Sequence, residues 1–335
     1  MAKQNKSLIW DAMLKQYKNV FKDYFANPDS YVRTYIVQIN GKVRHIITYD
    51  GEKGNQLRHF QNEFIKFVNP AYISSPSSHA YKEGHSIMTC VKQHMNNIAF
   101  LKSDIHSYFD SIDFTILFNR LLKIRFFAER KNDLRKCLKA CFYNNHLPIG
   151  FVSSPILSDI YLTDIDKKYS RSKKYTYTRY ADDFIISTND DNYEKIFEGV
   201  KDNLIKDLHT LKLELNDKKT YVRKLNQKGD AIHVLGVNIV RQTKNRNKIT
   251  ISDKTIRQIS KDFCKLVNKK RISNDNFNKE FDRLYGQMQF VKLCSQSSKK
   301  KLEKMLSIKL NKPVRIDANE LRKLSVKYCP NSSSR

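Results

Sequence analysis

The sequence lacks any apolar run of 18 or more residues, so it offers no candidate for a membrane-spanning helix. The segment from Met1 to Trp10 also lacks the apolar core of a secretory signal peptide. We therefore expect a cytoplasmic protein with no membrane partner.

Cysteine is scarce as well, with six in 335 residues and neither a Cys-x-x-Cys pair nor paired histidines at ligand spacing. This pattern argues against a disulfide framework and against a zinc site, and it indicates reduced thiols in the core or on the surface. The six positions are Cys90, Cys137, Cys141, Cys264, Cys294 and Cys329.

Acidic residues are few: 34 Asp and Glu face 62 Lys and Arg, which gives a formal net charge of +28. This excess is larger than solubility requires and indicates a polyanionic partner. From Arg241 to Arg335 there are 25 basic and 8 acidic residues, a net charge of +17, so we expect this part to contact phosphates. The alternative is a merely solvated lysine-rich surface, and charge alone does not decide between the two.

Hydrophobic residues make up 40% of the chain, which is enough for the core of one large domain or two ordinary ones. Their spacing predicts interleaved helices and strands, the pattern of an α+β sheet covered by helices. The predicted elements are a helix to about Phe25, a hairpin of Tyr31–Ile39 and Val43–Ile47 around Asn40-Gly41, a helix at Asn55–Val68, a strand at Ile98–Ile105, a helix after Ser153-Ser154-Pro155, two β-rich runs within Tyr175–Thr188, and helices at Ile256–Val267, Phe277–Leu293 and Lys300–Leu310. Residues 331–335 are expected to be disordered.

Two adjacent acids, Asp182 and Asp183, interrupt the apolar run from Tyr175 to Ile186. Neighbouring carboxylates in a half-buried strand repel each other and lose hydration, so a turn must expose them or a cation must neutralise them. The tip of a tight hairpin is the plain alternative to a metal site. A third acid, Asp104, follows another apolar strand, and three carboxylates suit Mg²⁺, which favours the metal site.

The tetrapeptide Tyr180-Ala181-Asp182-Asp183 resembles the signature of reverse transcriptases, and other motifs of that family occur in the expected order. The segment from Lys102 to Phe109 resembles the first metal motif. The resemblance implies that Asp104 is a metal ligand, with the Ile105 carbonyl as a second one, and that Phe109 contacts the nucleotide. As an alternative, Phe109 is an ordinary core residue.

Four further motifs carry the resemblance. Leu147-Pro148-Ile149-Gly150 implies that Gly150 lets backbone approach template and nucleotide, although an ordinary turn glycine is an alternative. The resemblance also places Lys219 near the incoming triphosphate, Arg44 as a triphosphate clamp in the fingers, and Leu235 and Gly236 in the primer-grip hairpin. Arg44 and Lys219 could instead be surface charges, since basic residues are common here.

The resemblance implies a right-hand polymerase of the α+β class, with a central palm sheet and a helical thumb. It places the N-terminal helix and fingers at 1–99, the palm at 100–240 with a second fingers portion at about 114–146, and a basic thumb with a short tail at 241–335. The implied cofactors are two Mg²⁺ ions, for which Mn²⁺ can substitute. The implied partners are dNTPs, an RNA template in the form of a structured non-coding RNA, and a DNA product or RNA–DNA hybrid.

The resemblance extends to the compact bacterial enzymes of the retron and phage-defence groups, which implies a role in antiphage defence. The retron hallmark Val-Thr-Gly is replaced here by Val234-Leu235-Gly236, and the retron Asn-Ala-x-x-His box is not found, which favours a non-retron defence system. No RNase H or endonuclease part is expected after the thumb. The alternatives are a retron enzyme making RNA-linked DNA, a template-independent terminal transferase, an RNA-dependent RNA polymerase and an inactive nucleic-acid-binding module.

Overall fold

The computed structural model describes residues 2–39, 42–69, 75–243, 246–268, 274–317, 320–321 and 323–324. The chain divides into two compact units, which are described separately. The first comprises Met1–Cys90 and Ala99–Val222, and the second comprises Val91–Ile98 and Arg223–Arg335.

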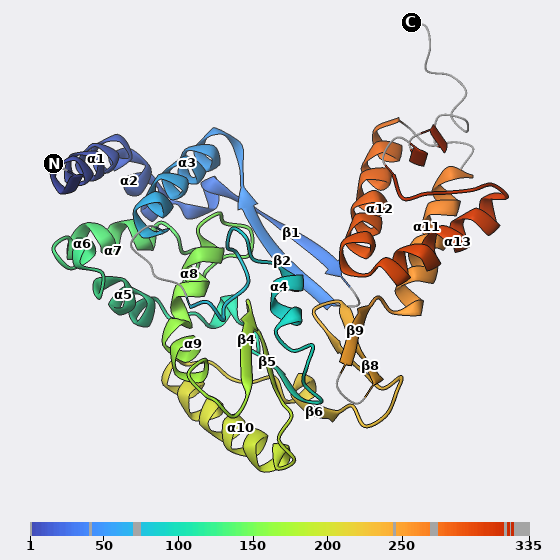
Figure 1. Cartoon of the computed structure of the whole chain (residues 1–335). Helices are drawn as coiled ribbons and strands as arrows, with labels where there is room; N and C mark the ends of the chain where they lie inside the picture. Colours follow the sequence, from blue (N-terminus) through green and yellow to red (C-terminus); the bar gives the residue numbers. More distant parts are fainter. Residues whose placement is uncertain are drawn as a thin grey trace, which may run out of the picture. The chain divides into compact units, whose positions relative to one another are not determined.

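The first unit interleaves helices and strands, as predicted from the hydrophobic spacing (Figure 1). Its elements are α1 (Ala2–Gln16), α2 (Lys18–Ala26), β1 (Val32–Ile39), β2 (Lys42–Tyr49), α3 (Gly51–Val68), α4 (Ile87–Lys92, which runs into the second unit), β3 (Ala99–Asp104), α5 (Phe114–Leu122), α6 (Arg125–Ala128), α7 (Lys131–Lys139), α8 (Ser154–Tyr161), α9 (Thr163–Tyr169), β4 (Thr176–Tyr180), β5 (Asp183–Thr188) and α10 (Tyr193–Thr210).

Strands β1 and β2 form the predicted antiparallel hairpin, in register from Val32↔Tyr49 to Ile39↔Lys42. Asn40 and Gly41 lie outside the described residues. Tyr31, predicted as the first strand residue, instead ends a short 3₁₀ turn that begins at Pro28, because proline fixes φ at a helical value. The hairpin thereby places Arg44 on β2, opposite Val37.

The central sheet has the strand order β4-β5-β3-β6, where β6 (Tyr221–Lys224) runs across the boundary between the units. Strand β5 pairs antiparallel with β3 and with β4. The residues of β3 and β5 are almost all buried, which explains why these strands are continuous apolar runs rather than alternating ones. Helix α9 contacts β4, and α10 buries its apolar side chains in the same core.

The predicted N-terminal helix is divided into two, because the regular helix is interrupted at the buried Tyr17. Its main anchor is Trp10, the single tryptophan, which is fully buried. The Trp10 ring packs edge-on against Phe67 of α3 and against Phe126 and Phe127 of α6, with centroids 5.0–5.7 Å apart. These contacts fasten the N-terminal helices to the rest of the unit.

Within the described residues, the second unit contains a three-stranded sheet and, after it, the three helices that were predicted for the region after Thr250. Its elements are β7 (Ala231–Val234), β8 (Val237–Thr243), β9 (Arg246–Thr250), α11 (Asp253–Val267), α12 (Asn274–Cys294) and α13 (Gln296–Leu310). Ser252 caps the start of helix α11: its side chain accepts a hydrogen bond from Thr255 N, a cap worth about 1 kcal/mol. The proposed thumb boundary near 241 falls inside β8. The expected disordered tail at 331–335 lies outside the described residues.

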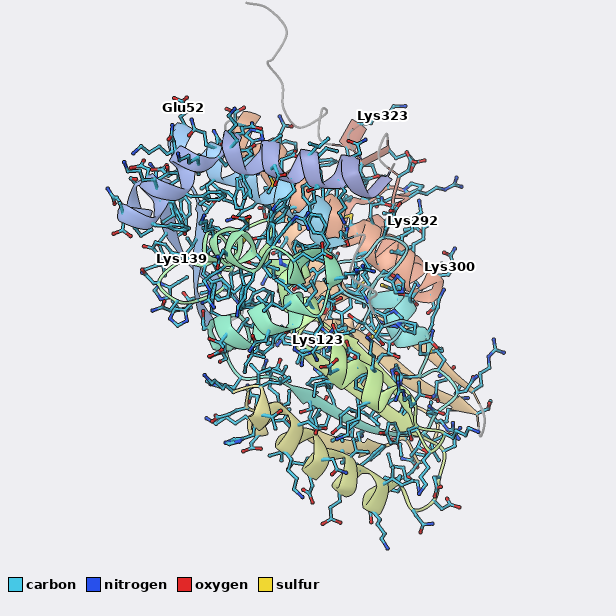
Figure 2. The ribbon with its side chains drawn as sticks, turned by 90° about the vertical axis from the view of Figure 1, so that its left-hand side faces the viewer. Glu52, Lys123, Lys139, Lys292, Lys300 and Lys323 are labelled. Atoms are coloured by element: carbon cyan, nitrogen blue, oxygen red, sulfur yellow. The ribbon has the colours of Figure 1, made fainter. Side chains whose placement is uncertain are left out.

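Exposed lysines occur on both units. Figure 2 labels Lys123 and Lys139 of the first unit and Lys292 and Lys300 of the second, and all four side chains are exposed. Within the described residues, no helix combines the length and the apolar character needed to cross a bilayer.

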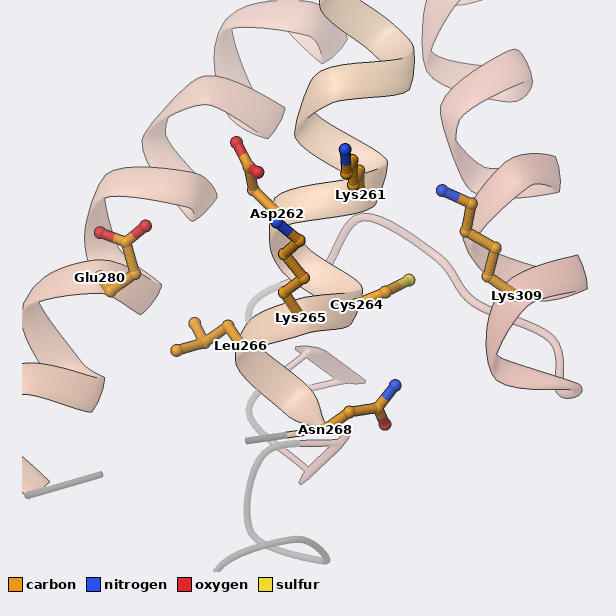
Figure 3. Close-up of a pocket in the computed structure, with 8 residues that line it drawn as sticks. All are labelled: Lys261, Asp262, Cys264, Lys265, Leu266, Asn268, Glu280 and Lys309. Carbon is orange, nitrogen blue, oxygen red and sulfur yellow. The ribbon is translucent and has the colours of Figure 1, made fainter. Parts of the chain in front are cut away.

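A cavity of about 770 Å³ lies among the helices of the second unit. Lys261 and Lys265 of α11 and Lys309 of α13 line it, together with Asp262 and Glu280 (Figure 3). Because acids alternate with the lysines, this cavity is no simple anion site. The three predicted acids do not line this cavity, because Asp104, Asp182 and Asp183 all belong to the first unit.

Candidate active site

The central sheet brings the three predicted acids together. Asp104 is the last residue of β3 and Asp183 the first of β5, and they are direct partners in the antiparallel register. Asp182 immediately precedes β5, and its carbonyl accepts a hydrogen bond from Ile105 N at 3.1 Å. Residues far apart in sequence thus meet at one end of the sheet, as their placement after apolar strands predicted.

The turn between β4 and β5 consists of Ala181 and Asp182, since Tyr180 pairs directly with Asp183. Ala181 has φ +55°, in the left-handed region. Such a two-residue connection is a tight hairpin, so the plain turn proposed for these acids is present. Asp104, however, lies beside that turn, and a turn alone does not account for a third carboxylate there.

A cavity of about 740 Å³ adjoins these acids, within the size range of ligand pockets. It brings together seven of the ten predicted site residues: Arg44, Asp104, Ile105, Phe109, Gly150, Asp182 and Lys219. Asp183 is not among the lining residues, although it is next to Asp182. Leu235 and Gly236 belong to the second unit and form the two-residue turn between β7 and β8, with φ +50° and +85°.

The electrostatics of the acids are unfavourable without a counter-charge. Burial raises the pKa of Asp182 to about 6, and repulsion from Asp183 and Asp104 adds to this effect. Burial also raises the pKa of Asp183, and Lys102 opposes the shift. Three mutually repelling carboxylates therefore fit a cation with a preference for hard oxygen ligands, such as Mg²⁺.

Two lysines partly neutralise the acids. Lys219 Nζ lies 2.5 Å from Asp104 Oδ2, and Lys102 Nζ lies 3.4 Å from Asp183 Oδ1. Among the described residues, no three His, Cys, Asp or Glu side chains form a ready cage for a metal ion. The carboxylates fit a cation by charge and donor type. In this structure Asp104 pairs with Lys219 and accepts a hydrogen bond from Asn216 Nδ2 at 3.4 Å, and Asp183 pairs with Lys102.

The backbone around Asp104 is fixed by the segment that carries Lys219. Asn216 N donates to Asp104 O at 2.7 Å, and His106 N donates to Glu214 O at 2.8 Å. Ile105 and Leu215 face each other in an isolated antiparallel bridge. The two hydrogen bonds of this bridge are made by Asp104 and His106, the residues on either side of Ile105. They hold Lys219 close enough to reach Asp104.

Phe109 and Gly150 line the cavity from two other segments. Phe109 is half-buried and packs edge-on against Tyr108, with centroids 5.6 Å apart, so it is both a core contact and a cavity wall. Gly150 has φ +121°, and a Cβ there would lie 2.3 Å from Ile47 O. Gly150 is therefore more than a turn glycine, because only glycine allows β2 to approach this closely.

Sequence reasoning missed Lys102, Tyr81 and Asn216. Lys102 was predictable in part, since it is two residues before Asp104 and side chains on a strand share a face at that spacing. Tyr81 lines the cavity, and burial raises its pKa to about 12. Asn216 belongs to the segment for which Lys219 was predicted, but the sequence assigned it no role. Nothing in the local pattern indicated Tyr81, which reaches the cavity through tertiary packing.

A family profile described as reverse transcriptase (RNA-dependent DNA polymerase) matches residues 39–239, which is more than half of the chain. A retron Ec83 reverse transcriptase of Escherichia coli is 28% identical over 219 residues, 61% of this chain and 67% of that protein. A retron Ec73 reverse transcriptase of the same species is 33% identical over 127 residues, 34% and 40% of the two chains. The chain thus spans well under half of this second relative. The expected resemblance to bacterial reverse transcriptases of the retron group is confirmed.

Among solved structures, a telomerase from Candida albicans in complex with a fragment of telomeric RNA is 12% identical, with a TM-score of 0.49, and the match covers 89% of this chain and 63% of that one. A Sicinivirus RNA-dependent RNA polymerase is 11% identical, also with a TM-score of 0.49, and the match covers 93% and 70%. The right-hand polymerase fold expected from the motifs agrees with the family and with the mixed sheet and helices.

Proposed function

The chain belongs to the reverse transcriptase family of RNA-directed DNA polymerases, and we propose that it extends a primer along an RNA template by two-metal nucleotidyl transfer. The observation that carries this proposal is the convergence of Asp104, Asp182 and Asp183 beside a cavity of about 740 Å³. The net charge of +28 supports it, because template and primer are polyanions.

The three carboxylates are the proposed ligands of two Mg²⁺ ions, with Mn²⁺ as a substitute and the Ile105 carbonyl as a further ligand. Bound cations would neutralise the acids and stabilise charge on the attacking and leaving oxygens. The chain's own groups bind and orient the dNTP. Arg44 and Lys219 supply positive charge to the triphosphate, Phe109 faces the sugar, and Gly150 leaves space beside the backbone. Lys219 would exchange Asp104 for phosphate oxygens as the nucleotide enters.

The proposed domains follow the motifs. We assign the fingers to 1–99 with a second portion at about 114–146, the palm to the remainder of 100–240, and the thumb to 241–335. Leu235 and Gly236 form the proposed primer grip. The tight turn that they make between β7 and β8 supports this role, because Gly236 carries no side chain and leaves its backbone open to a strand of nucleic acid.

The test is primer extension on a defined RNA template with Mg²⁺ and dNTPs. We expect Asp182→Ala to lower the rate of extension by at least about 1000-fold, because the variant lacks one of the proposed ligands of the catalytic cations. Its melting temperature should not fall, since the change removes a repelled carboxylate. Asp191→Ala is the matched control, because Asp191 is exposed and does not line the cavity.

A folded Asp182→Ala protein that retains more than a few per cent of activity would contradict the metal assignment. Extension that is unchanged when the RNA template is omitted would identify a terminal transferase instead. Incorporation of ribonucleotides in preference to dNTPs would identify an RNA polymerase.

We also propose that the enzyme acts in antiphage defence by copying a structured non-coding RNA encoded beside its gene. Similarity to retron reverse transcriptases supports this role. Cells that carry the locus should survive a phage panel better than cells with the Asp182→Ala locus. Sequencing of nucleic acid bound to the protein should recover one dominant RNA, and RNA-linked DNA would identify a retron. Equal survival, with RNA drawn evenly from the transcriptome, would overturn the proposal.

A further inference from the structure

A fully buried arginine lies next to the proposed metal site but outside the cavity. Arg179 of β4 has no exposed surface, and its guanidinium contacts two buried acids on separate helices. Its Nε and Nη2 donate to Asp166 of α9 at 2.8 and 2.6 Å, and Nη2 also donates to Asp159 of α8 at 2.7 Å. Burying three charges is costly in hydration, and such groups often contribute little to net stability. The cluster therefore points to a role beyond stability.

The remaining guanidinium nitrogen is bonded to the turn that precedes the acids. Arg179 Nη1 donates to Ala181 O at 2.8 Å. Ala181 is in the left-handed conformation, with φ +55°, which is unfavourable for a residue with a Cβ. The next residue along the chain is Asp182. The hydrogen bond thus acts on the peptide group that joins the strained residue to the first acid of the pair.

Several further groups hold the arginine itself in place. Arg179 N donates to Ser77 O and His79 N donates to Arg179 O, both at 2.8 Å, so its backbone is bridged to the segment beside β4. Asp159 accepts a hydrogen bond from Ser78 Oγ, and Lys82 Nζ lies 3.6 Å from its other oxygen. The guanidinium is fully buried, all three of its nitrogens are hydrogen-bonded, and one of these bonds is to the turn.

We propose that Arg179 is a positioning residue: held by Asp159 and Asp166, it fixes the left-handed turn at Ala181 and thereby sets the placement of Asp182 and Asp183 toward their cations. The inference rests on the proposed function. The planar guanidinium can bind a carboxylate with two nitrogens and a carbonyl with the third, whereas a lysine ammonium acts as a single point of charge. The positive charge of a lysine would therefore be insufficient to hold the turn, which needs the several donors of the planar guanidinium.

The test compares Arg179→Lys with Tyr177→Phe. Tyr177 is also buried, and its hydroxyl donates to Asp166 Oδ1 at 2.7 Å, so the control perturbs the same cluster without removing the bond to Ala181. Binding of Mn²⁺ to the protein is measured by electron paramagnetic resonance, which does not depend on turnover. Primer extension at saturating Mg²⁺, the KM for dNTP and the melting temperature are measured in parallel.

We expect Arg179→Lys to weaken Mn²⁺ binding about tenfold and to lower the extension rate at least tenfold, with the KM for dNTP within about twofold of the wild type. Tyr177→Phe should lower the melting temperature by an amount comparable to that in Arg179→Lys, but its Mn²⁺ binding and extension rate should stay at the wild-type level. Asp159→Asn weakens the hold on the guanidinium more gently, with an expected two- to threefold loss in Mn²⁺ affinity. If Arg179→Lys does not fold, the Mn²⁺ affinity of Asp159→Asn tests the positioning role in its place.

The inference is overturned if Arg179→Lys binds Mn²⁺ as tightly as Tyr177→Phe does. If Arg179→Lys fails to fold, it is overturned if Asp159→Asn binds Mn²⁺ as tightly as Tyr177→Phe does. Failure of the proposed function gives a different result. In that case the wild type itself would show no Mn²⁺ binding that Asp182→Ala removes and no extension on RNA. A wild type that passes both tests, with Arg179→Lys unchanged, would refute only the positioning role.

Discussion

Gly150 allows a quantitative prediction, because the structure shows what an added methyl group would meet. A Cβ at this position would lie 2.3 Å from Ile47 O, whereas ordinary contact begins at 3.4 Å. Gly150→Ala therefore requires the two segments to separate by about 1 Å. The movement displaces β2, the strand that carries Arg44, and it stretches the hydrogen bond from Ile47 N to Ile149 O, now 3.0 Å long.

Two costs combine in this variant. Alanine at φ +121° is strained by about 1–3 kcal/mol, and loss of the hydrogen bond costs about 0.5–1.5 kcal/mol. We expect a destabilisation of about 1.5–4.5 kcal/mol, which lowers the melting temperature by roughly 3–18 °C for a unit of this size. The protein remains folded at 25 °C, because domains of this size have about 5–15 kcal/mol of stability.

Gly150→Ala should also raise the KM for dNTP at least tenfold, because displacement of β2 moves Arg44 away from the triphosphate. Two controls separate stability from function. Leu204→Ala removes a buried side chain from α10, outside the cavity, so it should lower the melting temperature and leave the KM unchanged. Gly199→Ala has open space in the middle of α10 and should stabilise by about 0.5–1 kcal/mol.

The measurements are thermal melts by circular dichroism and steady-state primer extension at varied dNTP. The reasoning fails if Gly150→Ala melts within about a degree of the wild type with an unchanged KM. It also fails if Leu204→Ala raises the KM as much as Gly150→Ala does, because the effect would then come from general destabilisation.

Two further predictions follow from the cavity and from the charge. Phe109→Ala should reduce the preference for dNTP over rNTP at least tenfold, since a ring against the sugar excludes the 2′-hydroxyl; unchanged selectivity in a folded variant would remove this role. Affinity for template–primer should fall steeply with salt, with a log-log slope of about −0.7 to −0.9 per neutralised phosphate, because residues 241–335 carry +17; a nearly flat dependence would mean that these charges only face solvent.

The sequence predicted those features that depend on local pattern. Continuous apolar runs predicted β3 and β5, and acids at their ends predicted where Asp104 and Asp183 would meet. The break at Tyr17 was not predictable from periodicity, because apolar spacing continues through it and the interruption depends on tertiary packing. The strand β9 after residue 245 was also missed, since its short polar sequence, Arg246–Thr250, has no apolar alternation.

Side-chain partners were beyond the reach of local pattern for a different reason. Asp159 and Asp166 read as ordinary helical acids, and only the folded chain places both against Arg179. The same holds for Lys219, whose partner Asp104 is on another segment. Pairs of this kind are decided by tertiary contacts, which sequence spacing does not encode.

The charge distribution gives an independent reason for cations at the proposed site. The chain as a whole carries +28, which attracts a nucleic acid from a distance. At the end of β3 and β5, however, three carboxylates face two lysines, so the incoming phosphates meet a local excess of negative charge. Lys219 can leave Asp104 for the triphosphate only if another positive charge replaces it. A divalent cation between carboxylates and phosphates satisfies both groups at once, and a polymerase that relied on lysines alone would leave one of them unpaired.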